Sequence, residues 1–109
     1  MPTSRGRLEF RSTDFVAALA ALSAAQKYGR VVTLSFNQGE LELARGATSV
    51  RLSAHGAWPD TAAVGTKFVK DLLRRRKALP ELLVLSGSDS HLHFSHYAVP
   101  CSWLGGNRP

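Results

Sequence analysis

An internal repeat constrains the fold of this 109-residue chain more than any other feature of its sequence. Three pairs of segments align in the same order and at nearly the same offset. The pairs are Thr13–Leu19 with Thr66–Leu72, Val32–Ser35 with Leu83–Ser86, and Leu41–Leu43 with Leu92–Phe94. Any one of these matches could be a chance similarity between apolar segments. Three matches in register predict a structural unit that occurs twice.

The first half has the pattern of a strand, a helix and three further strands. Leu8 and Phe10 alternate with charged neighbours, which is typical of a half-buried strand. Thr13 is the expected N-cap of a helix that carries Phe15 and Leu19 at helical spacing. Three segments with alternating apolar residues follow, namely Val32–Phe36, Leu41–Leu43 and Val50–Leu52.

The second half repeats this order of elements. A short strand through Val64 precedes a helix that Thr66 is expected to cap and that ends before Pro80. Three strands are then expected around Leu83–Ser86, His91–Phe94 and Tyr97–Trp103.

The repeat therefore predicts one α+β domain over residues 7–103, built from a duplicated βαβββ unit with halves at 7–56 and 57–103. Two helices are expected on one face of antiparallel sheets, because the apolar side of each helix needs a sheet to cover it. The residues expected beneath the helices are Phe15, Leu19, Phe68 and Leu72. Residues 1–6 and 104–109 are expected to be flexible ends.

This arrangement resembles one domain of a bacterial DNA sliding clamp, the ring-shaped processivity factor of replicative polymerases. The stretch Val64–Arg74, with Leu79-Pro80 and the segment Leu83–Phe94 behind it, is similar to the second helix and following strands of such a domain. Leu8–Leu19 is similar to the first strand and helix. The resemblance covers residues 7–103 and rests on apolar patterns rather than on a chemical signature.

The resemblance implies a non-enzymatic protein of the DNA clamp fold that encircles duplex DNA without reading its sequence. Helices would line the hole and sheets would face outward. Because the chain supplies only one such domain, encircling DNA would require about six copies, joined through edge strands into a homo-oligomer. Replication or repair proteins are the further partners that the resemblance implies.

Positive charge is concentrated on the second predicted helix. The formal net charge is +6, and four basic residues recur on this helix at spacings of three, four and three. These spacings place Lys67, Lys70, Arg74 and Lys77 on one stripe, opposite the apolar residues. The stripe suits phosphate contact without base readout, although a solvated helix face is the ordinary alternative. The residues predicted to bind DNA are Lys27, Lys67, Lys70, Arg74, Arg75 and Lys77.

The first helix departs from what a helix lining a DNA channel would carry. Its outward side is expected to be alanine, at positions 17, 20, 21 and 24, with only Lys27 nearby. An alanine face permits the close approach of another helix or a flat partner, or it simply reflects good helix propensity.

Self-association is expected through unpaired strand edges, which proteins of this kind pair, cover or charge. The segments Thr48–Ser53 and Tyr97–Trp103 are the predicted edges. The predicted interface residues are Val50, Tyr97 and Trp103.

No catalytic set, cofactor motif or metal site is predicted. His91 and His93 share a strand face, but no cysteine or carboxylate cluster completes a tetrahedral set with them and His96. Cys101 is expected in a buried apolar strand, and a single cysteine fits a reducing cytoplasm. No apolar run is long enough for a membrane span.

Two other functions compete with a DNA-binding clamp-like protein. One is a protein-interaction module that keeps the clamp fold but binds a replication or repair partner without DNA. The other is a small basic domain of unrelated role.

Overall fold

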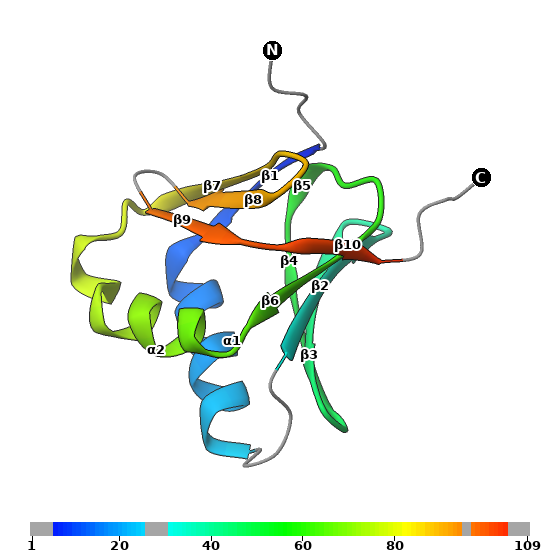
Figure 1. Ribbon diagram of the computed structural model, residues 1–109. Coiled ribbons are helices and arrows are strands. Elements are labelled where there is room, and N and C mark those ends of the chain that lie inside the picture. Colours follow the sequence, from blue (N-terminus) through cyan, green and yellow to red (C-terminus); the bar gives the residue numbers. More distant parts are fainter. Residues whose placement is uncertain (1–5, 26–30, 95–96, 105–109) are drawn as a thin grey trace.

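Two helices and two sheets make up the described part of the chain, residues 6–25, 31–94 and 97–104 of a computed structural model (Figure 1). In chain order the elements are β1 (Gly6–Arg11), α1 (Ser12–Ala25), β2 (Val31–Asn37), β3 (Glu40–Arg45), β4 (Thr48–Ser53), β5 (His55–Ala57), β6 (Thr61–Gly65), α2 (Lys67–Arg74), a 3-10 turn η1 (Arg76–Ala78), β7 (Leu82–Gly87), β8 (His91–Phe94), β9 (Tyr97–Pro100) and β10 (Ser102–Leu104). The α+β class expected from the sequence is confirmed.

Each sheet takes strands from both halves of the chain. The first sheet has the order β5-β1-β7-β8-β9 and the second has the order β10-β6-β2-β3-β4, and all neighbours are antiparallel. Exchanging β1 to β5 with β6 to β10 converts one strand order into the other. The central contacts join the halves, because β1 pairs with β7 and β6 pairs with β2. Neither half therefore forms its sheet alone.

Single residues carry the chain from one sheet to the other. Ala54 connects β4 to β5, and Cys101 connects β9 to β10. Each amide donates to a carbonyl in a hairpin turn, Ala54 to Gly39 at 3.0 Å and Cys101 to Ser90 at 2.8 Å. The expectation of one strand over Tyr97–Trp103 was wrong because this crossing divides it. Cys101 is accordingly half-buried at the crossing rather than inside a buried strand.

Both helices lie on the same side of the two sheets, in the angle between them (Figure 1). Phe15 and Leu19 of α1 and Phe68 and Leu72 of α2 are buried, as expected. A row of rings joins the layers: the Phe10 and Phe15 centroids are 4.9 Å apart, those of Phe15 and Phe94 are 5.6 Å apart, and those of Phe94 and Phe68 are 5.9 Å apart. Phe94 of β8 thus contacts both helices.

The start of α1 differs from the expected N-cap. The helix begins at Ser12, and Thr13 is exposed within its first turn. Ser12 is buried, and both its amide (2.9 Å) and its hydroxyl (3.3 Å) donate to the carbonyl of Glu81. The Glu81 carbonyl, just before β7, thus fixes the turn from β1 into α1. This contact cannot be predicted from the local sequence, because Glu81 is remote from Ser12 along the chain. Thr66 does occupy the N-cap position of α2, without a side-chain capping hydrogen bond.

Two tryptophans pack together beside Gly87, the last residue of β7. The rings of Trp58 and Trp103 lie 5.2 Å apart between centroids. Trp58 donates to the carbonyl of Leu34 at 3.3 Å, and Trp103 donates to that of Ser88 at 2.8 Å. A Cβ on Gly87 would lie 2.7 Å from the Trp103 ring, so the ring requires glycine there.

We predict that Phe94→Ala lowers the free energy of unfolding by about 3–5 kcal/mol, because it removes a ring shared by both helices and leaves a cavity. Urea denaturation followed by circular dichroism measures the change. The matched control is Leu82→Ala in β7. Leu82 is 54% exposed, so this variant should change the free energy of unfolding by no more than about 0.5 kcal/mol. Equal losses in the two variants would contradict the role given to Phe94.

Candidate nucleic-acid interface

The segment from residue 67 to residue 77 concentrates the positive charge of the chain. Six of the 14 lysines and arginines lie in it, and all six are exposed. On α2, Phe68, Val69 and Leu72 are buried against the core. At about 100° per residue, Lys67, Lys70 and Arg74 fall within an arc of roughly 60° on the exposed side. We call these three residues the basic face of α2.

The predicted stripe is shorter than the sequence indicated. The α-helix ends at Arg74, and Lys77 lies in the 3-10 turn η1, so including Lys77 in the helical stripe was wrong. The apolar spacing could not locate this end, because Leu72 and Leu73 give way to a run of cations rather than to a glycine or proline. Lys27 lies outside the described residues.

The cations after Arg74 make contacts within the domain. The Arg75 guanidinium carbon lies 5.1 Å from the centroid of the Tyr97 ring. Nη1 of Arg76 donates to the carbonyl of Leu73 at 2.8 Å, which satisfies a carbonyl in the last turn of α2. Arg75 is therefore directed toward β9, away from the basic face.

Asp71 is the one carboxylate within α2, and it bonds to β9. The Tyr97 hydroxyl donates to Oδ2 of Asp71 at 2.9 Å. Burial raises the pKa of Tyr97 above its ordinary value of 10.0, and the hydrogen bond and negative charge of Asp71 raise it further. The contact fastens the edge strand β9 to α2 and gives Asp71 a hydrogen-bond donor of its own.

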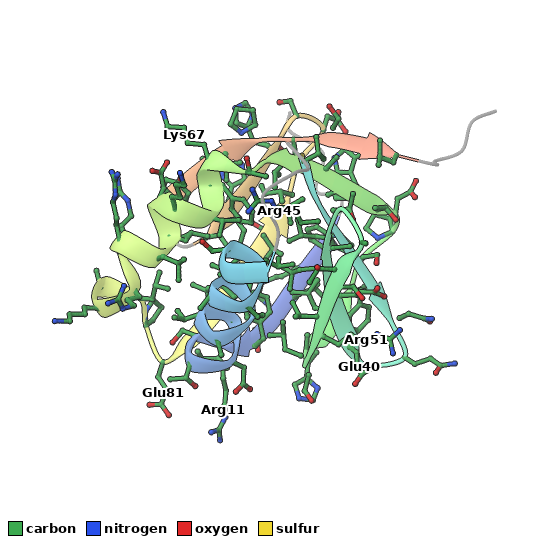
Figure 2. All side chains as sticks on the ribbon, turned by 90° about the horizontal axis from the view of Figure 1, so that it is seen from below. Arg11, Glu40, Arg45, Arg51, Lys67 and Glu81 are labelled. Carbon is green, nitrogen blue, oxygen red and sulfur yellow. The ribbon has the colours of Figure 1, made fainter. Side chains whose placement is uncertain are left out.

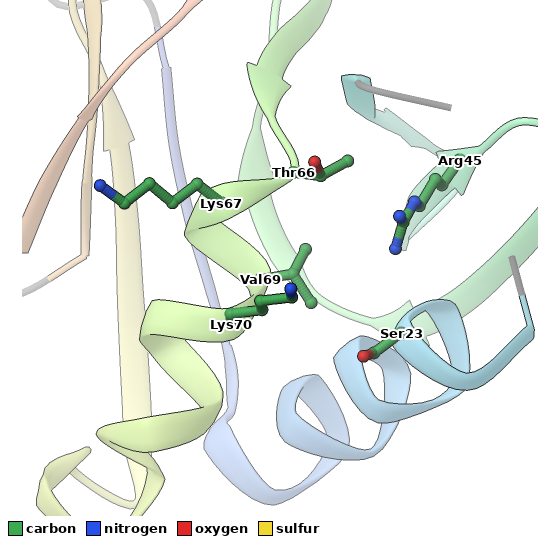
Figure 3. A pocket seen from close by; sticks show the side chains of 6 residues that line it. All are labelled: Ser23, Arg45, Thr66, Lys67, Val69 and Lys70. Atoms are coloured by element: carbon green, nitrogen blue, oxygen red, sulfur yellow. The ribbon is translucent and has the colours of Figure 1, made fainter. Parts of the chain in front are cut away.

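A hollow opens beside the first turn of α2, between that turn, the end of α1 and the end of β3 (Figure 3). Its volume is about 250 Å³. Figure 3 shows Arg45 reaching from β3 into the space above α1, while the Lys67 side chain extends to the other side of α2. The lining residues within the described part of the chain are Ser23, Arg45, Thr66, Lys67, Val69 and Lys70, with no carboxylate among them. We call this space the basic hollow.

Arg45 and Ser23 were missed by the sequence analysis. They are distant from α2 along the chain, and only the path of the β2–β3 hairpin under the helices brings Arg45 to α2. One local signal existed: Arg45 ends a strand whose first four residues, Glu40 to Leu43, alternate between charged and apolar. Figure 2, which looks onto the helices, shows Arg45 and Lys67 toward one end of this layer and Arg11 and Glu81 toward the other.

Ala17, Ala20 and Ala21 are exposed on α1, as the sequence predicted, and the exposed Asp14 lies one turn before Ala17. An open groove of about 440 Å³ runs between this side of α1 and β4. The predicted interface residue Val50 lines the groove and is half-buried against the core.

The two predicted edge segments do lie at sheet edges. β4 is an edge of the second sheet, and β9 is an edge of the first. Tyr97 and Trp103 are both half-buried and hold partners inside the domain, Asp71 and Ser88 respectively.

Other chemistry gains no support from the geometry. His91 and His93 have ring centroids 6.3 Å apart, His96 lies outside the described residues, and the residues that are described contain no cluster of three metal-ligating side chains. Neither α1 nor α2, as described, is long and apolar enough to cross a membrane.

No known protein-family profile matches the sequence. No curated protein matches it either. Among solved structures, the fold is similar to that of the DnaN sliding clamp, DNA polymerase III subunit beta, from Bartonella birtlesii, determined with griselimycin bound. The TM-score is 0.68 and the sequence identity is 13%, over 95% of this chain and 32% of the clamp chain. The domain therefore has a clamp-like fold, and it spans about a third of the length of the clamp that it matches.

We predict that Tyr97→Phe lowers the free energy of unfolding by about 1 kcal/mol at neutral pH, because it removes the hydrogen bond to Asp71. A group whose pKa is raised in the folded state adds stability that is complete below its unfolded pKa and is lost as the pH rises through the folded pKa. Stability should therefore fall more steeply above about pH 10 in the parent protein than in Tyr97→Phe. Urea denaturation across this alkaline range measures both curves, and parallel curves would contradict the assignment.

Proposed function

We propose that this chain is a non-enzymatic, clamp-like protein that binds duplex DNA through the basic face of α2 without reading the base sequence. The observation that carries the proposal is the exposure of Lys67, Lys70 and Arg74 together on one helix of a clamp-like fold. Lysine and arginine contact phosphates at any sequence, and such contacts position a protein on DNA without specifying a site.

The neighbouring surface is compatible with a polyanion. The alanines on the exposed side of α1 add no negative charge and leave room for a flat partner. Asp71, the carboxylate closest to the basic face along α2, is bonded by Tyr97. A duplex lying along the helices would therefore meet cations on α2 and, beyond Asp14 in the first turn of α1, small side chains on the rest of that helix.

We infer that several copies act together. The chain matches about a third of one clamp chain, so one copy offers a surface too small to surround a duplex. The matching strand orders of the two sheets support a duplicated unit, in which β4 and β9 are equivalent edges; each half adds a short fifth strand, β5 or β10, to the expected βαβββ order.

The edges that suit pairing between copies are β4 and β9. The other two edges, β5 and β10, have three residues each, whereas β4 has six and β9 has four. Short edge strands offer few unpaired backbone groups. Pairing β4 of one copy with β9 of the next is head-to-tail, and such contacts close a ring when their rotation allows it.

A protein-interaction module that does not bind DNA is the second candidate. The groove between α1 and β4 favours it, because most of its lining is apolar and the lining also includes the charged residues Asp14 and Arg51. A replication or repair protein would be the partner in that case.

For DNA binding, we predict that Lys70→Gln with Arg74→Gln weakens the affinity for duplex DNA and reduces the slope of log K against log salt by about 2, since each phosphate contact contributes about 0.9. Fluorescence anisotropy with two duplexes of unrelated sequence measures both quantities. The two duplexes should give the same affinity.

The matched control removes two cations elsewhere. Arg7 and Arg51 form exposed ion pairs with Glu9 (3.1 Å) and Glu42 (3.6 Å) on the sheets. Replacing both by glutamine removes the same formal charge at a cost in stability of no more than about 1 kcal/mol each, and the salt slope should stay unchanged. If both double variants lower the salt slope equally, DNA binding depends on the net charge of the protein alone, and the protein-interaction module becomes the better candidate.

For assembly, we predict that Ser49→Lys in β4 and Ala98→Lys in β9 each weaken self-association, because lysine on an edge strand opposes pairing. Each variant keeps one intact edge, so mixing the two should restore dimers and nothing larger. Analytical ultracentrifugation distinguishes these species. A mixture that stays monomeric, or single variants that assemble normally, would rule out head-to-tail pairing of β4 with β9.

A further inference from the structure

Arg45 occupies an unusual position for a cation in this chain. Among the described arginines, it alone is half-buried, whereas the other six are exposed. It ends β3 and reaches the basic hollow beside α2 (Figure 3). Its guanidinium carries five N–H donors, so it can hold a partner within the domain and still donate to a group bound in the hollow.

The lining of the hollow is suited to an oxyanion. Arg45 and Lys70 give it two formal positive charges, since the Lys67 side chain extends to the other side of α2 (Figure 3), and Ser23 and Thr66 add two hydroxyls that can donate hydrogen bonds. The Thr66 side chain makes no capping hydrogen bond to α2. Val69 is buried and closes the hollow with an apolar wall.

Residues from three separate elements meet here: Ser23 from α1, Arg45 from β3, and Lys70 from α2. Lysine and arginine differ in what they offer an oxyanion, because the planar guanidinium can donate two parallel hydrogen bonds while the ammonium acts as a point charge. A tetrahedral phosphoryl group can take both kinds of contact at once. The space of about 250 Å³ is equivalent to roughly eight waters, which admits a phosphoryl group with part of the molecule that carries it.

We propose that the basic hollow is a discrete binding site for one phosphoryl group, with Arg45 and Lys70 as its cationic ligands. Its occupant is a backbone phosphate of DNA or a small phosphate ester, and the two share the same contacts. Occupation by a DNA phosphate rests on the function proposed above, and it would fix the position of the basic face along the DNA backbone. The site itself does not depend on that function, because its geometry comes from Arg45 and the end of α1.

The test uses the whole protein labelled with ¹⁵N and titrated with inorganic phosphate, against sodium chloride at matched ionic strength. Amides of Ser23, Thr66 and Lys70 should shift along saturable curves with phosphate and remain in place with chloride. Arg45→Gln should weaken phosphate binding about tenfold, as the loss of a charge-assisted bidentate contact implies. Arg45→Lys, which keeps the charge but loses the planar fork, should fall between Arg45→Gln and the parent protein.

The matched control is Arg51→Gln, which removes the same group from the neighbouring strand β4, where Arg51 pairs with Glu42 at 3.6 Å. It should bind phosphate like the parent protein. Should Arg45→Gln fail to fold, Arg45→Lys and Lys70→Gln supply the same comparison. Non-saturable shifts with phosphate, or equal affinities in the Arg45 and Arg51 variants, would overturn the site.

A second titration with a short DNA duplex distinguishes the two sources of phosphate. If DNA shifts the same amides and free phosphate competes with it in the parent protein but not in Arg45→Gln, the DNA backbone occupies the site. If phosphate binds and DNA does not, the site stands as one for small phosphate esters, and the proposed DNA-binding function fails separately. If DNA binds with the salt slope predicted above and phosphate does not saturate, the function stands and the discrete site is refuted.

Discussion

The pairing of β1 with β7 and of β2 with β6 is the constraint on which the rest of the structure depends. Each pairing joins one half of the chain to the other, so both sheets form only when the halves come together. The same event brings the rings of Phe15 and Phe68 against the ring of Phe94. Helix and sheet layers are thereby fixed at once, because each helix covers a surface to which both halves contribute.

This packing explains how α2 can be both short and highly charged. Eight residues are few for a helix that must be stable on its own, but Phe68, Val69 and Leu72 anchor it to the core. Tyr97 holds Asp71, and Arg76 bonds the carbonyl of Leu73. With the helix secured in this way, its exposed side is free to carry cations. The same packing carries Arg45 to α2 from a hairpin more than twenty residues earlier in the chain.

The periodic patterns of apolar residues were sufficient to predict the helix and sheet layers and much of the core. The features that they did not predict depend on contacts between residues remote in sequence. Phe15, Leu19, Phe68 and Leu72 were identified by helical spacing, and all four are buried. Ser12 replaces Thr13 at the helix start because the carbonyl of Glu81, which is remote in sequence, accepts its hydrogen bonds. Tyr97–Trp103 read as one strand because alternation does not reveal a change of sheet at Cys101. The basic face was predictable from residues on one helix, but Arg45 joins it only through the fold.

The central claim is that the basic face of α2 lies against the DNA backbone, and chemical protection of its lysines tests this most directly. Lys67 and Lys70 are exposed and belong to a chain with only four lysines, so mass spectrometry can follow each one after brief acetylation. Our account predicts that duplex DNA protects both lysines equally for unrelated base sequences, and that raising the salt concentration restores their reactivity. Acetylation of Lys67 and Lys70 at unchanged rates, on a protein that is demonstrably bound to DNA, would contradict it.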